Sequence, residues 1–174
     1  LEPNREFLDK FQNASRHDIV KEEAVTSSTI HDEFKDEEID FIKLDIQGAE
    51  LSALRGGEEE LKKCLGLEVE VQIATLYKEA SLFGEINDYL KSKDFVFIDF
   101  VNLCRWDRYA YNSYGQIAFG DGLWLRSPEY MHAKETNEIL KYIGICSLYG
   151  RYDLIKRSIE INSLSLSKKT KDAL

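Results

Sequence analysis

Apolar and polar residues alternate along two short segments of the chain, two further short segments are mainly apolar, and between them apolar residues recur every three or four positions. Alternation is typical of strands, because successive side chains point to opposite faces of a sheet. The wider spacing is typical of helices. The four segments predict strands at Ile39–Leu44, Leu67–Ile73, Phe95–Val101 and Gln116–Leu125.

The segments around these strands carry helix signals. Helices are predicted after Asn4, near Thr29–Phe34 with Ser28 as the cap, and at Ala49–Leu54, Glu58–Cys64, Leu82–Lys93, Asn137–Tyr149 and Tyr152–Ile161. Strands alternating with helices favour an α/β fold with a mostly parallel sheet. The link from Val101 to Gln116 has no helix signal, which favours an antiparallel last strand.

Two of the predicted strands carry charges on one face. Lys43 and Asp45 share a face in the first strand, and Glu68, Glu70 and Gln72 share a face in the second. Central parallel strands are normally apolar on both faces, and isolated buried charges are unfavourable. If the strands are neighbours, Lys43 can therefore pair with Glu68 or Glu70. A salt-bridged face open to water and a ligand site both explain this pattern.

Asp45 is the first candidate for chemistry, because it is the last residue before the Gly48 turn. Open α/β sheets bind ligands beyond the carboxyl ends of their strands. Glu50 falls in the first turn of the next helix, where the helix dipole favours a carboxylate whatever its function. Arg105 and Trp106 begin an aromatic, charged loop, which fits a lid over a polyhydroxylated substrate or a surface loop anchored by the tryptophan.

Composition narrows the class of protein. With 174 residues, 43% of them apolar, the chain is long enough for one globular domain. Its net charge of −9 argues against nucleic acid as the main partner, and its apolar runs are too short to span a membrane. The three cysteines are scattered, which favours reduced thiols and a cytoplasmic protein. The three histidines lack the spacing of metal ligands, so no metal is predicted.

Several of these segments together resemble the FkbM-type family of S-adenosylmethionine-dependent methyltransferases. They are IDFIKLDIQGAELSALRGG (Ile39–Gly57) with its K-x-D-x-x-G-x-E pattern, LGLEVEVQIATLYKEASLFGEINDYLKSKDFVFIDF (Leu65–Phe100), Arg105-Trp106 and GQIAFGDGLWLR (Gly115–Arg126). The resemblance covers residues 1–126 and implies a Rossmann-like methyltransferase catalytic domain there, followed by a helical extension at 127–174. It further implies O-methylation of a hydroxyl on a sugar, glycan or secondary metabolite.

The resemblance also implies roles for individual residues. Glu2 would accept hydrogen bonds from the ribose hydroxyls of S-adenosylmethionine, and Asp45 would lie beside the methyl group and the acceptor as base or orienting group. Lys43 and Glu70 would support Asp45 in catalysis. Candidate contacts to the acceptor are Glu50, Arg105, Trp106 and Asp121. The implied partner is a small-molecule or glycan hydroxyl, with a second copy of the chain as a candidate partner in a homodimer.

One part of the family pattern is missing from this sequence. The family's first strand and glycine-rich cofactor loop should precede Glu2, and Phe11–Ser27 looks shorter than its family counterpart. We therefore expect a sheet that lacks its N-terminal strand and cofactor loop. This keeps an alternative open, in which the chain is a catalytically inactive, methyltransferase-like binding or structural module. A strand and a Gly-x-Gly-like turn upstream of Leu1 would favour the enzyme.

Overall fold

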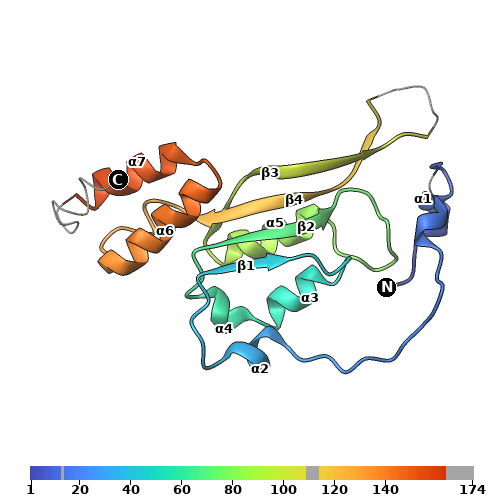
Figure 1. Ribbon diagram of the computed structural model, residues 1–174, viewed down its shortest axis with the longest axis horizontal. Coiled ribbons are helices and arrows are strands. Elements are labelled where there is room, and N and C mark those ends of the chain that lie inside the picture. The colour runs from blue at the N-terminus through green and yellow to red at the C-terminus, as the bar shows by residue number, and fades with distance from the viewer. Residues whose placement is uncertain (13, 109–113, 164–174) are drawn as a thin grey trace.

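The computed structural model describes residues 1–12, 14–108 and 114–163 (Figure 1). The elements are α1 (Arg5–Leu8), a 3-10 turn (Ala14–His17), α2 (Ile30–Phe34), β1 (Phe41–Leu44), α3 (Glu50–Arg55), α4 (Glu58–Leu61), β2 (Gly66–Gln72), α5 (Phe83–Ser92), β3 (Phe95–Trp106), β4 (Gln116–Arg126), α6 (Thr136–Leu148) and α7 (Tyr152–Ile161). Every predicted strand and helix is present. The main difference in length is in β3, which continues to Trp106 instead of ending at Val101.

The four strands form one sheet in the order β1-β2-β4-β3. The predicted antiparallel last strand is confirmed, but the prediction of a mostly parallel sheet is wrong. Only β1 and β2 pair in parallel, while β4 is antiparallel to both β2 and β3. The reason is that β4 inserts between β2 and β3, so β3 has no parallel neighbour although it runs in the same direction as β1 and β2.

One face of the sheet is apolar and is covered by α3, α4 and α5 (Figure 1). Leu67, Val69 and Val71 of β2 lie on this face together with Trp124 of β4, and all four are at most 1% exposed. Strand alternation therefore sends the intervening residues of β2 to the opposite face.

The opposite face is covered in part by α6 and α7, which lie at the end of the sheet where β1 and β2 begin (Figure 1). Leu123 and Leu125 of β4 pack there against Ile139 and Tyr142 of α6. The helical extension thus shares a hydrophobic core with the sheet. The carboxyl ends of β1 and β2 lie away from this cover.

Arg126 fixes the end of β4 to the helices on the apolar side. Its side chain is 2% exposed, and its guanidinium donates hydrogen bonds to the carbonyl oxygens of Leu61, Cys64 and Lys93. The guanidinium carbon also lies 3.8 Å from the ring centre of Phe95. Burial lowers the pKa of Arg126, but the three carbonyls and the ring compensate the buried charge.

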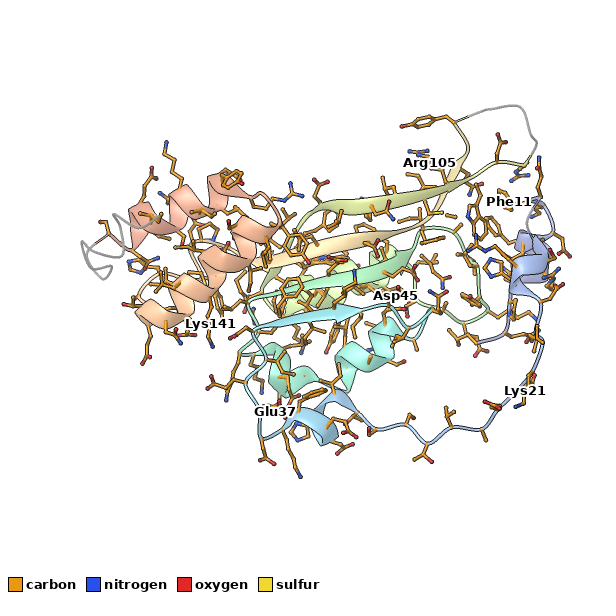
Figure 2. The ribbon with its side chains drawn as sticks, in the orientation of Figure 1. Phe11, Lys21, Glu37, Asp45, Arg105 and Lys141 are labelled. Atoms are coloured by element: carbon orange, nitrogen blue, oxygen red, sulfur yellow. The ribbon has the colours of Figure 1, made fainter. Side chains whose placement is uncertain are left out.

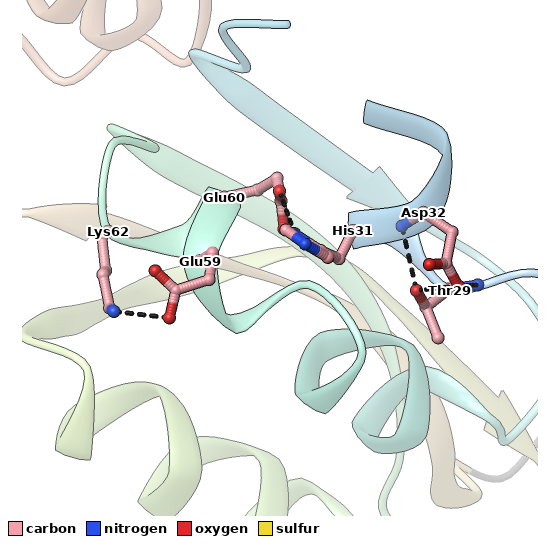
Figure 3. Close-up of polar contacts among 6 residues, drawn as sticks. All are labelled: Thr29, His31, Asp32, Glu59, Glu60 and Lys62. Carbon is pink, nitrogen blue, oxygen red and sulfur yellow. Dashed lines mark hydrogen bonds and ion pairs between the residues drawn. The ribbon is translucent and has the colours of Figure 1, made fainter. Parts of the chain in front are cut away.

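The short helix α2 is held against α4 (Figure 3). His31 Nδ1 lies 2.9 Å from Glu60 Oε1, and the helix is capped by Thr29, which forms a capping box with Asp32. The predicted cap, Ser28, contacts the Glu33 carboxylate instead. Threonine is the cap because its hydroxyl lies within reach of the free backbone N–H groups of the first turn.

Candidate active site

Three carboxylates line up across the sheet at the carboxyl end of β2. The register places Glu70 opposite Asp121 of β4, and β1 pairs with β2 so that Lys43 is opposite Glu68. Asp45 comes two residues after Lys43, and its charge acts directly on Glu70. The structure therefore brings together three of the residues expected to take part in chemistry, Asp45, Glu70 and Asp121.

Lys43 pairs with Glu68 rather than with Asp45. The second oxygen of Glu68 accepts a hydrogen bond of 2.5 Å from Tyr149, at the end of α6. Burial acts to raise the pKa of Glu68, but these two hydrogen bonds outweigh it and lower the pKa. The expected pairing of Lys43 with a carboxylate of β2 is confirmed, and its partner Glu68 has a hydrogen-bond donor at each carboxylate oxygen.

The loop after β1 is fixed by Glu50. This residue is 2% exposed, and its Oε1 accepts hydrogen bonds of 3.0 Å from the backbone N–H groups of both Ile46 and Gly48. Gly48 has φ of 108°, and a Cβ there would come within 2.9 Å of the Gln72 amide nitrogen. Glu50 is therefore positioned to shape the loop, and its expected contact with the acceptor stays a prediction.

Gln47 connects two of the carboxyls. Its backbone adopts φ of 59°, and its side-chain nitrogen donates to Asp45 Oδ1 at 2.9 Å and to Glu70 Oε2 at 2.8 Å. Its amide oxygen accepts a hydrogen bond of 3.3 Å from Tyr77. Gln47 was not predicted from the sequence. The available signal was a polar side chain directly before a glycine turn, but its two partners depend on the fold.

Glu70 is the most perturbed carboxyl of this group. Burial and the charges of Asp45, Glu50 and Asp121 raise its pKa to about 7. Tyr77, on the far side of Gln47, also has a raised pKa because of burial and the charge of Glu70. A carboxyl that titrates near neutral pH beside an exposed carboxylate can hold or exchange a proton under physiological conditions.

Glu2 lies at the same end of the sheet. Pro3 forms a β-bridge with Tyr77, and the Leu1 side chain lies against Gly48, within 2.7 Å of the position of a Cβ there. The Glu2 carboxylate is exposed and pairs with Lys78 at 2.5 Å. The ribose contact expected for Glu2 stays a prediction.

Arg105 and Trp106 lie elsewhere, toward the outer end of the β3–β4 hairpin. Figure 2 shows Arg105 well apart from Asp45. Trp106 packs against Phe11 and Phe119, with ring centres 5.6 and 6.1 Å away, as an anchor for the hairpin. Part of the loop expected as a lid, residues 109–113, lies outside the described residues. Contact of these residues with a substrate also stays a prediction.

Two negative findings apply to the described part of the chain. None of its helices has the length and hydropathy needed to cross a membrane. Within the same residues, no group of three or more histidines, cysteines, aspartates and glutamates could hold a metal ion.

Comparison with known families identifies the family. The model of the methyltransferase FkbM domain matches residues 3–97, which is more than half of the chain. The chain belongs to the FkbM methyltransferase family. The FkbM match includes Lys43, Asp45, Gln47 and Glu70 and ends before Arg105, Trp106 and Asp121. No curated protein and no solved structure matches the chain.

Proposed function

We propose that this FkbM-family chain is an S-adenosylmethionine-dependent O-methyltransferase that acts on a hydroxyl of a sugar, a glycan or another secondary metabolite. The observation that carries the proposal is the pair of carboxyls Asp45 and Glu70, held together by Gln47 at the carboxyl end of the parallel strands. This pair falls within the region that matches the family. Open α/β sheets bind their ligands at this edge.

The residues present fit S-adenosylmethionine by their chemistry. When bound, this cofactor supplies a methyl group on a positively charged sulfur, and its ribose offers two hydroxyls as donors. Glu2 and Asp45 are the residues that would hold it. Both are exposed carboxylates, which accept hydrogen bonds from hydroxyls and favour a cation nearby.

Asp45 is the proposed base. Its carboxylate would take the proton of the acceptor hydroxyl, and bound S-adenosylmethionine would supply the methyl group that replaces this proton. General-base catalysis of this kind contributes about 10²–10⁴-fold, and holding the reactants in line contributes more. Glu50 keeps the loop in place so that Asp45 is fixed before the acceptor arrives.

The test measures cofactor binding and methyl transfer separately. Calorimetry of the full-length protein with S-adenosylhomocysteine is expected to show binding. Mass spectrometry of a panel of sugars and polyhydroxylated metabolites, incubated with S-adenosylmethionine, is expected to show addition of one methyl group. Asp45→Asn should lower turnover by about 10²-fold or more, a far larger factor than its effect on cofactor affinity.

Asp40→Asn is the matched control, because Asp40 precedes β1 at the opposite end and pairs with Lys141. It should leave turnover close to that of the wild type. Equal turnover in Asp45→Asn and Asp40→Asn would remove Asp45 as the base. Absence of cofactor binding by the wild type would favour a non-catalytic module.

A further inference from the structure

One side chain in the loop between β1 and α3 connects two carboxyls of the candidate site. A single amide group, the side-chain nitrogen of Gln47, donates to carboxyls from two different elements, Asp45 after β1 and Glu70 in β2. An amide nitrogen carries two hydrogens, so each carboxyl can receive one of them. The amide therefore sets the separation of the two carboxyls.

We propose that Asp45 and Glu70 act as one carboxyl pair that holds a single proton at neutral pH, with Gln47 as the positioning residue that couples them. This inference rests on the proposed function, because it states how the base of that site is prepared. Glu70 keeps the proton, and the exposed carboxyl of Asp45 is left to accept the proton of the hydroxyl.

The surroundings of Glu70 favour its protonated form. Glu70 is half-buried in the sheet, whereas Asp45 is exposed. The charged and titratable groups that face Glu70 come from four segments, and they are Asp45 after β1, Glu50 of α3, Tyr77 after β2 and Asp121 of β4. The three carboxylates among them oppose ionisation of Glu70, and two neighbouring carboxyls with unlike burial lose their protons in separate steps.

The backbone of the loop is built to present Gln47. Its φ of 59° is unusual for a residue other than glycine and aims its side chain at the two carboxyls. Glu50 holds the amides on both sides of it, at Ile46 and Gly48, and Tyr77 holds the amide oxygen. The orientation of the side-chain amide is thereby fixed, since the oxygen faces a donor and the nitrogen faces two acceptors.

The test is a double-mutant cycle read by carbon-13 NMR titration of the Glu and Asp carboxyls in the full-length protein. Asp45→Asn in the wild-type background should lower the pKa of Glu70 from about 7 toward the ordinary 4.5. The same substitution in a Gln47→Gly background should give a decrease at most about half as large, because the two carboxyls are no longer held together. Glycine is chosen because it accepts the positive φ at this position.

Asp121→Asn is the matched control. Asp121 also raises the pKa of Glu70, but Gln47 makes no hydrogen bond to it among the described contacts. Its effect on Glu70 should be the same with and without Gln47. If the glycine variant loses the loop structure, Gln47→Asn serves instead, since asparagine tolerates a positive φ but is one carbon too short to span both carboxyls.

Two results would overturn the proposal: an Asp45→Asn effect that is independent of residue 47, or a Glu70 carboxyl that titrates at the ordinary value in the wild type. Either result can occur in a protein that still transfers methyl groups, in which case the proposed function stands alone. Conversely, a coupled pair in a protein that binds no S-adenosylhomocysteine would retain the pair and reject the methyltransferase.

Discussion

Buried charge is compensated at the amino end of β2 but not at Glu70, near the carboxyl end of the strand. At the amino end, the Arg126 guanidinium is 2% exposed, and carbonyl oxygens and aromatic rings surround it. At the carboxyl end, Glu70 is half-buried among Asp45, Glu50 and Asp121, all of its own charge sign. The first arrangement compensates a buried charge and stabilises the fold. The second leaves charges in conflict, which is typical of a site that binds a cation or moves a proton.

Arg126 should give the largest change in stability. Arg126→Ala leaves three buried carbonyl oxygens without their donor and opens a space beside Phe95. We expect the free energy of unfolding to fall by about 3–5 kcal/mol, measured by urea denaturation. Arg157→Ala is the control, because that arginine forms an exposed pair with Glu129 and should change stability by about 1 kcal/mol or less. Similar losses in the two variants would contradict the structural role of Arg126.

Glu50 is the residue at the carboxyl end that resembles Arg126, because it is buried and compensated. Glu50→Ala removes the acceptor for two backbone amides and should destabilise the protein by about 2–3 kcal/mol. Glu50→Gln keeps an acceptor oxygen and should cost less. Hydrogen exchange of the Ile46 and Gly48 amides should become faster in the alanine variant. Unchanged exchange at both amides would show that Glu50 does not hold the loop.

The conflict at Glu70 predicts a pH dependence with a definite sign. Its pKa is about 7 in the folded chain and 4.5 as the ordinary value, so the folded state binds the proton more tightly than the unfolded state. The free energy of unfolding should therefore fall as the pH rises from about 4.5 to 7, and the loss remains at higher pH. Because Glu70 is partly exposed, solvent screening reduces the effect to about 1–2 kcal/mol.

Glu70→Gln isolates this contribution. The variant carries no charge at residue 70, so its stability should fall less than that of the wild type between pH 5 and 8, by about 1–2 kcal/mol. At pH 8 it should be more stable than the wild type. Urea denaturation at a series of pH values measures both. Parallel pH curves for the two proteins would mean that Glu70 ionises normally in the folded state.

Features that depend on the local chain were predicted from the sequence better than features that depend on long-range packing. Alternation in β2 correctly separated Val69 and Val71 from Glu68 and Glu70, because a two-residue period depends only on the local chain. The order of the strands was not predictable in this way, since the position of β4 between β2 and β3 depends on long-range packing. The tryptophan at 106 was correctly considered as an anchor, and its partners Phe11 and Phe119 come from distant segments.

The residues of the candidate site also differ in how far the sequence predicted them. Asp45 was predicted from its residue type and position, and Glu70 and Asp121 from the family resemblance. The structure brings the three together. Gln47 was not predicted, because its role depends on a positive φ and on partners from two elements. Lys43 was predicted to pair with Glu68 or Glu70, and its partner is Glu68, while its support of Asp45 in catalysis stays a prediction. A two-residue difference in register decides between Glu68 and Glu70, and alternation alone does not distinguish the two because both lie on the same face.

Substitution of Lys43 should give the smallest effect on stability. It also tests the difference between two carboxylates of β2, Glu68 and Glu70. Glu68 is compensated by Lys43 and Tyr149, while Glu70 two residues later is not. Lys43→Met removes a pair in which the lysine is 61% exposed, so stability should fall by only about 0.5–1 kcal/mol. The pKa of Glu68 should rise, because a hydrogen bond that lowers it is lost, and that of Glu70 should change less. Tyr149→Phe, which removes the other hydrogen bond, should act on Glu68 in the same direction. Carboxyl NMR titration measures both groups in each variant, and a larger change at Glu70 than at Glu68 would place Lys43 with the reacting pair after all.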